Sequence, residues 1–169
     1  MNLLSLGFIL YFIIMKKATK IIIGILILLI VIQFIKPKRN TGDAFGRNDF
    51  THEIQTPDSI MRILKVSCLD CHSNHTNYPW YADINPVGWW LTYHVNKGKK
   101  ELNFSEFVTY NEKRKNKKLD EIAKQVKEHE MPISSYTLLH KDAKLNEQQI
   151  NSLVKWTEAA REEIKNKPF

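Results

Sequence analysis

The stretch Cys68-Leu69-Asp70-Cys71-His72 contains the only two cysteines of the chain, three positions apart, with a histidine directly after the second. This spacing is typical of a c-type haem attachment site, where two thiols bind the haem vinyl groups and the imidazole binds iron. A thioredoxin-like redox pair would need a βαβ pattern around it, a zinc site would need further ligands, and a disulfide would leave His72 without a role. We therefore predict one covalent haem c per chain, bound by Cys68 and Cys71, with His72 as an iron ligand.

The composition narrows the class of protein. The chain has 169 residues and a formal net charge of +7, and much of its apolar content lies before residue 36. About 115 to 130 residues remain for a soluble domain, which is a common domain size. A positive surface favours acidic proteins or anionic lipid as partners, and no nucleic-acid-binding module is recognisable. We expect redox proteins as partners and no nucleic acid.

The first 36 residues predict an attachment to a membrane. Residues 21–35 are almost unbroken Ile, Leu and Val, and Lys20 and Lys36 could extend their ammonium groups to the membrane surface. Fifteen helical residues measure about 22 Å, so flanking residues would be needed to span a hydrocarbon core of roughly 30 Å. No small-residue cleavage site follows. We predict an uncleaved, single-pass anchor over residues 1–36, with a cleaved signal peptide as the alternative.

A second apolar run, residues 3–15, is too short to span a membrane alone. Met15-Lys16-Lys17 has the character of a start with its own positive segment, which predicts Met15 as an alternative start of translation. Because haem c is attached outside the bacterial cytoplasm, the motif predicts a protein of the cytoplasmic membrane whose soluble domain faces the periplasm or the exterior.

The rest of the chain has helical signals and no strand pattern of any length. Thr56-Pro57-Asp58 predicts a helix start with Thr56 as the N-cap. Asn85-Pro86 predicts a helix of about 86–97 that stops at Gly98. Asn146-Glu147-Gln148-Gln149 resembles a capping box for a last helix of about 147–164.

These signals predict an all-α domain over residues 56–169, joined to the anchor by a tether or loosely packed wrap over residues 37–55. A helix with an apolar face is expected before residue 130. The basic run 113–118 is interpreted as the solvated start of that helix, with steering of an acidic partner or lipid contact as alternatives.

Three of the four tryptophans, Trp80, Trp89 and Trp90, lie within eleven residues. A flat, largely apolar haem packs well against large planar side chains, and indole N–H groups could reach its propionates. We predict that these three tryptophans contact the haem. An ordinary aromatic core is the alternative, because aromatic residues dominate cores in general.

The sixth iron ligand is predicted to be Met131. Pro132 disfavours helical structure at the residue before it, so Met131 should be displayed from a loop far downstream of His72. A thioether is a soft ligand that raises the reduction potential relative to a second imidazole, although methionine is also a common core filler. The alternatives are His94 and His140, and the less suitable candidates are Met61, His52, His75 and His129.

The chain resembles the bacterial haem-binding-domain family with a single Cys-x-x-Cys-His site, over roughly residues 50–160. The resemblance is carried by Cys68-x-x-Cys71-His72-Ser73-Asn74, Tyr78-Pro79-Trp80-Tyr81, Pro86-Val87-x-Trp89-Trp90-Leu91, His94-Val95, Leu102-Asn103-Phe104-Ser105, Met131-Pro132, Tyr136 and His140. The order of elements is also similar to that of small single-haem cytochromes c. The resemblance implies a cytochrome c-like helical domain around one haem, although the aromatic insertion between Trp80 and Asn103 departs from a minimal cytochrome.

Together these features predict a membrane-anchored c-type haem protein that carries single electrons. The alternative is a haem-based sensor or a peroxidase-like enzyme, which requires an open sixth position on the iron. A third class is a structural or assembly protein in which haem stabilises a small fold.

Overall fold

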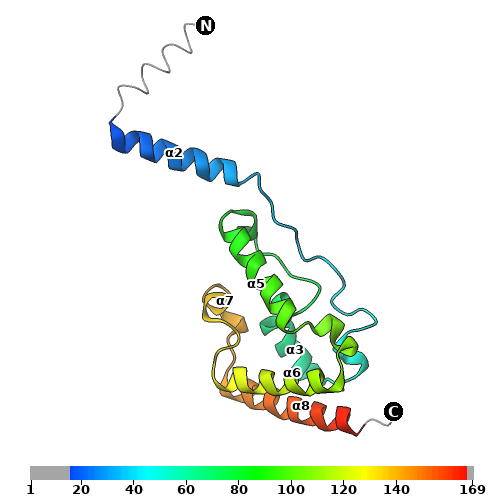
Figure 1. Cartoon of the computed structure of the whole chain (residues 1–169). Helices are drawn as coiled ribbons and strands as arrows, with labels where there is room; N and C mark the ends of the chain where they lie inside the picture. The colour runs from blue at the N-terminus through cyan, green and yellow to red at the C-terminus, as the bar shows by residue number, and fades with distance from the viewer. Residues whose placement is uncertain (1–15, 167–169) are drawn as a thin grey trace. The chain divides into compact units, whose positions relative to one another are not determined.

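The computed structural model describes residues 16–166, and all regular elements in this range are helical (Figure 1). They are α2 (Lys17–Ile32), η1 (Phe50–His52), α3 (Asp58–Ser67), α4 (Leu69–His72), η2 (Trp80–Asp83), α5 (Val87–Glu101), η3 (Phe104–Thr109), α6 (Glu112–Lys127), α7 (Ser134–Leu139), η4 (Lys141–Ala143) and α8 (Glu147–Lys165), where η marks a 3-10 helix. Within this range, one isolated antiparallel bridge joins Thr41 and His75, and no strand forms. The all-α prediction is confirmed. The predicted apolar run 3–15 and the start at Met15 lie outside the described residues.

The chain forms two compact units. Residues up to 38 and residues 79–91 make the first, and residues 39–78 and 92–169 make the second. The chain therefore passes between the units three times, and α5 begins in the first unit and ends in the second. The second unit starts at Arg39, well before residue 56, so most of the predicted tether belongs to it.

In the first unit, the end of α2 is bonded to the segment before α5. The Gln33 side chain makes two hydrogen bonds of 2.9 Å with the Asn85 backbone: its amide nitrogen donates to the carbonyl, and its amide oxygen accepts from the N–H. The Asn85 amide also donates to the carbonyls of Ile32 and Ile35, at 2.8 and 3.0 Å. The Asn85 side chain thus links the last residue of α2 to the turn that follows it.

Helix α2 has 16 residues and no buried side chain. Its length of about 24 Å is shorter than a hydrocarbon core of roughly 30 Å. Among residues 16–166, no helix combines the length and apolar character needed to cross a membrane. The predicted single-pass anchor over residues 1–36 is therefore not supported by the described helices.

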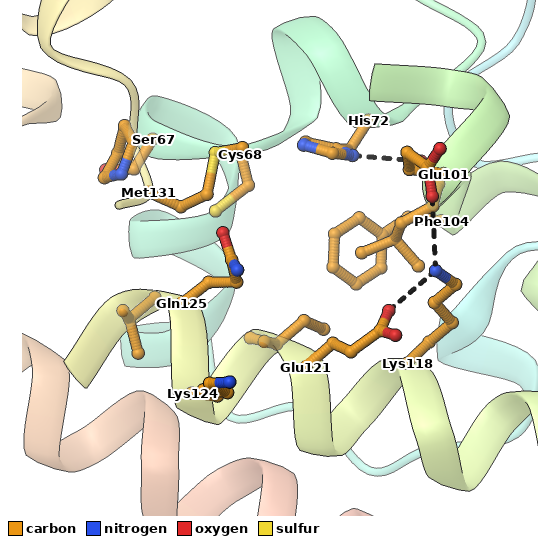
Figure 2. A pocket seen from close by; sticks show the side chains of 14 residues that line it. Ser67, Cys68, His72, Glu101, Phe104, Lys118, Glu121, Lys124, Gln125 and Met131 are labelled. Carbon is orange, nitrogen blue, oxygen red and sulfur yellow. Dashed lines mark hydrogen bonds and ion pairs between the residues drawn. The ribbon is translucent and has the colours of Figure 1, made fainter. Parts of the chain in front are cut away.

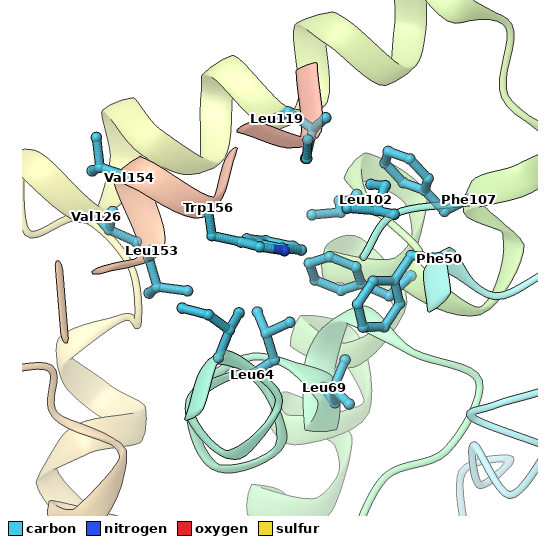
Figure 3. Packing of buried hydrophobic residues seen from close by; sticks show 14 of the residues in the cluster. Phe50, Leu64, Leu69, Leu102, Phe107, Leu119, Val126, Leu153, Val154 and Trp156 are labelled. Carbon is cyan, nitrogen blue, oxygen red and sulfur yellow. The ribbon is translucent and has the colours of Figure 1, made fainter. Parts of the chain in front are cut away.

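The core of the second unit lies between α3, α6 and α8 (Figure 3). Phe50 and Ile54, from the segment predicted as a tether, are buried in it. The Phe50 ring packs edge-on against Phe104 and Trp156, with centroid distances of 5.0 and 6.2 Å. Aromatic pairs in this arrangement contribute about 0.5–1.5 kcal/mol each beyond their burial. Phe50 and Ile54 thus fix this segment against the helices.

The helix starts were predicted with mixed success. The capping box at Asn146 and Gln149 is confirmed, with two reciprocal hydrogen bonds of 2.9 Å. The predicted N-cap at Thr56 is wrong, because its hydroxyl donates to the Ile54 carbonyl at 3.1 Å and Pro57 occupies the cap position.

Candidate functional site

Helix α3 delivers the cysteine motif to the interior of the second unit. Its residues Ile60 and Leu64 are buried in the core, as is Leu69 in α4. Cys68 lies at the junction of the two helices and accepts backbone hydrogen bonds from Cys71 and His72, at 3.2 and 3.0 Å. The tight turn that results keeps both thiols and the imidazole close to one another.

Two pockets of about 450 and 240 Å³ adjoin the motif. Residues that line both are Ser67, Cys68, His72, Glu101, Met131 and Pro132. Cys71 and His94 line the smaller pocket only. In the larger one, side chains of α6 line the side opposite the motif (Figure 2). Its volume falls within the range of about 300–1,000 Å³ that is typical of small-molecule and cofactor sites. The fold therefore brings Met131, which is distant in sequence, to the smaller pocket that Cys68, Cys71 and His72 also line.

The His72 ring is oriented by a backbone carbonyl. Its Nδ1 lies 3.0 Å from the Leu102 oxygen, and because a carbonyl only accepts, Nδ1 must carry the proton and donate it. Nε2 is then the nitrogen with a free lone pair, which is the usual arrangement for a histidine that binds metal. Burial lowers the pKa of His72, against an opposing effect of hydrogen bonding to the backbone of Leu102 and Gly98. The neutral form, which binds metals, is thus favoured.

The two cysteines are free thiols, and their environment differs from that of a reactive redox pair. Burial, followed by the proximity of Cys71, raises the pKa of Cys68 to about 12. Burial, followed by the charge of Asp70, raises the pKa of Cys71 to about 11. Thiols that exchange disulfides have a lowered pKa in an electropositive setting. The pair is therefore suited to a buried, fixed attachment.

Gly98 allows α5 to approach the motif closely. A β-carbon at this position would lie 2.7 Å from the Cys71 carbonyl oxygen and 3.2 Å from the Cys71 β-carbon. The prediction that Gly98 ends the helix is wrong, because α5 continues to Glu101. The glycine is needed for close packing of the helix in its last turn and not for a stop.

Asp70, between the two cysteines, connects the motif to two other segments. Its Oδ1 accepts hydrogen bonds of 3.0 Å from the backbone and side-chain nitrogens of Asn77, and its carbonyl accepts one of 2.6 Å from Thr76. Its Oδ2 accepts a hydrogen bond from Tyr136, which also lines the smaller pocket. Sequence reasoning did not assign a role to Asp70, although its place inside the motif was a signal.

A charged group lies in the wall of the larger pocket. Lys118 forms ion pairs with Glu121 at 2.6 Å and with Glu101 at 3.7 Å. The hydrogen bond from Lys118 is the main reason that the pKa of Glu121 is lowered.

Lys115 is buried and pairs with Glu53 at 2.6 Å. The basic run is therefore only partly solvated, since two of its lysines are engaged within the fold.

The remaining candidates are distributed over both units. Trp80, Trp89 and Trp90 lie in the first unit, and every residue that lines the two pockets lies in the second. The Trp89 indole donates to the Ile35 carbonyl at 2.8 Å. Haem contact by the three tryptophans stays a prediction. His140 stacks on Tyr136 at 4.3 Å.

Comparison with known proteins identifies a family for this chain. The model of the haem-binding domain family matches residues 27–159, a range that includes the motif and Met131. No curated protein and no solved structure matches the chain. The site beside the pockets contains two thiols, an imidazole whose Nε2 has a free lone pair, and a thioether. The thiols suit the haem vinyl groups, and the imidazole and the thioether suit the iron. Because the match covers most of the sequence, the chain belongs to the haem-binding domain family.

Proposed function

We propose that the protein is a c-type haem protein in which Cys68 and Cys71 bind one haem covalently. Each thiol would add its S–H across one vinyl group, forming a carbon–sulfur bond and leaving the hydrogen on the other vinyl carbon. The observation that carries this proposal is the convergence of Cys68, Cys71 and His72 on the smaller pocket, with Cys68 and His72 also lining the larger one. A covalent attachment would keep the cofactor from dissociating outside the cytoplasm.

His72 and Met131 are proposed as the two axial ligands. His72 would bind iron through Nε2, because the Leu102 carbonyl occupies Nδ1. Met131 lines both pockets together with His72 and follows the end of α6. When bound, the haem supplies reversible one-electron chemistry whose potential is set by its axial ligands and their surroundings. Because two side chains, His72 and Met131, would hold the iron, the function supported best is single-electron transfer.

Membrane association through α2 and an extracytoplasmic location are part of the same proposal. The apolar side chains of α2 are unburied, and lysines occur just before it and after it. A redox protein with this element would act at a membrane surface, with partner proteins that exchange electrons with it.

The test of covalent attachment is a denaturing gel stained for haem. Protein made with a cytochrome c maturation system should give a stained band, and the Cys68→Ala/Cys71→Ala double variant should lose the stain while the chain is still detected. A Ser59→Ala variant, at an exposed position of α3 that lines neither pocket, should keep it. An unstained, correctly matured wild-type chain would exclude covalent attachment.

The alternative, a sensor or a peroxidase-like enzyme, is supported by His94, which lines the smaller pocket but is not needed as a ligand in the leading proposal. The coordination state distinguishes the two functions. A six-coordinate, low-spin spectrum in both oxidation states supports electron transfer, whereas a five-coordinate, high-spin spectrum supports ligand chemistry at an open position.

A further inference from the structure

We infer that residues 80–90, which comprise η2, the link after it and the first turn of α5 and are called here the aromatic loop, contact the interfacial region of an anionic lipid bilayer next to α2. The inference rests on the proposed membrane association of α2 but is independent of haem attachment. It assigns Trp80 and Trp90 to lipid, which differs from the haem contact predicted from sequence.

The first support is that the aromatic loop is fastened to the end of α2. Asn85 is only 2% exposed and is bonded to Ile32, Gln33 and Ile35. The Trp89 indole donates to Ile35 at 2.8 Å, and the Lys36 ammonium donates to the Asp83 carbonyl at 2.7 Å. These hydrogen bonds keep the aromatic loop next to the C-terminal end of α2.

These contacts also suit a site at the edge of hydrocarbon. Backbone carbonyls near the bilayer core must find partners within the protein, because no water is available there. The carbonyls of Ile32 and Ile35, which lie at and just after the end of α2, have such partners in Asn85 and Trp89. Water would have satisfied the same carbonyls at an ordinary exposed helix end.

The second support is the set of side chains that the aromatic loop exposes. Trp80 is 77% exposed and Trp90 is 45% exposed. Ile84 and Val87, between them, are also exposed. By contrast, Trp156 in the second unit is buried in a core. Indole rings are enriched at membrane–water interfaces, where an apolar ring and a polar N–H are both accommodated.

Charge identifies the lipid class. Lys36 and Lys38 follow the same end of α2 within six residues and belong to the first unit. Basic residues next to a membrane segment are attracted by anionic headgroups. Apolar, aromatic and basic side chains occur together at this end of α2. An anionic bilayer has a hydrocarbon core, an interface and charged headgroups that suit these three kinds of side chain, whereas a protein partner would need a surface that complements all of them.

The test uses the full-length haem protein and vesicles of phosphatidylethanolamine and phosphatidylglycerol. Flotation first establishes that the chain is bound. Hydroxyl-radical footprinting with mass spectrometry then measures oxidation of each side chain, relative to the urea-unfolded protein. We expect relative oxidation at Trp80 and Trp90 to be several-fold lower than at Phe45 and Leu138, two exposed apolar residues of the second unit.

Each outcome decides between proposals. If the chain does not float, both membrane association and this inference fail. If it floats but Trp80 and Trp90 are oxidised as fully as Phe45 and Leu138, the inference is wrong and association through α2 stands. The haem-free Cys68→Ala/Cys71→Ala variant is the matched control. If Trp80 and Trp90 lose their protection from oxidation in this variant, the cofactor covers them and the inference is overturned. If the protection persists, the inference is supported.

Discussion

The hydroxyl of Tyr136 donates a 2.9 Å hydrogen bond to Oδ2 of Asp70, the residue between the motif's leucine and its second cysteine. The same hydroxyl lies 3.4 Å from the Val66 carbonyl. Burial, followed by the charge of Asp70, raises the pKa of Tyr136, so the phenol stays protonated and remains a donor. Because α7 begins three residues after Met131, this bond fastens the segment that carries the proposed sixth ligand to the haem motif.

Replacing Tyr136 by Phe should loosen this segment and leave the covalent haem in place. Hydrogen bonds to charged groups contribute about 1.5–3 kcal/mol, so we expect the free energy of unfolding to fall by about that amount. The sulfur-to-iron absorption band of the oxidised protein should weaken. Tyr93→Phe, at an exposed position, is the control and should change neither quantity. An unaltered band and stability in Tyr136→Phe would show that the bond does not position Met131.

Replacing Met131 by Ala tests the ligand itself. We expect the sulfur-to-iron band to disappear, the reduction potential to fall and the haem stain to remain, because the thioether would be lost while both cysteines are kept. Met61→Ala, on α3 and packed against the core, serves as the control for a lost methionine. It should lower stability and leave the band intact. If Met131→Ala keeps the wild-type spectrum, His94 and His140 become the ligands to test.

Adding a β-carbon at Gly98 should disturb the motif from the side of α5. The added carbon would meet backbone atoms of Cys71, which cannot rotate away, and overpacking of this kind costs about 1–3 kcal/mol. We expect Gly98→Ala to lower the unfolding free energy and the yield of haem attachment. Gly24→Ala is the control, since a β-carbon there meets nothing within 4 Å. Equal attachment yields in the two variants would contradict the proposed close contact.

The buried ion pair between Lys115 and Glu53 should be a strong link between α6 and the segment after η1. Lys115 is only 7% exposed, and removing one partner of a buried pair leaves an uncompensated charge that costs about 3–5 kcal/mol. Urea unfolding of Glu53→Gln should show a loss approaching this range. The exposed pair Lys117–Glu121 provides the comparison, with a loss below about 1 kcal/mol for Lys117→Gln. Similar losses in both variants would mean that Lys115 is solvated after all.

Local patterns predicted what local chemistry controls. The capping box at Asn146 depends on residues within a few positions of each other, and it was predicted correctly. The cysteine motif likewise contains in five residues the thiols and imidazole that the fold brings to the pockets.

Features that depend on distant contacts were missed or misread. Glycine is common just after the end of a helix, so Gly98 was interpreted as a stop. Only its closeness to Cys71 in the fold shows that the glycine is needed for packing. Phe50 and Ile54 lie in a polar, glycine-containing stretch with no period, so their burial beneath α8 residues such as Trp156 left no trace in the local pattern. The hydrogen bond between Tyr136 and Asp70 joins positions 66 residues apart and has no sequence signature.

The three passages of the chain between its two units have a practical consequence for protein production. An apolar N-terminal segment is commonly deleted to obtain a water-soluble domain, and a deletion to Arg39 would look harmless because it keeps the whole second unit. It would, however, remove Gln33 and the carbonyls of Ile32 and Ile35 from Asn85, whose side chain is buried against them. The shortened protein would therefore lose the hydrogen bonds that hold the stretch before α5, and its behaviour in solution would not represent that of the intact chain.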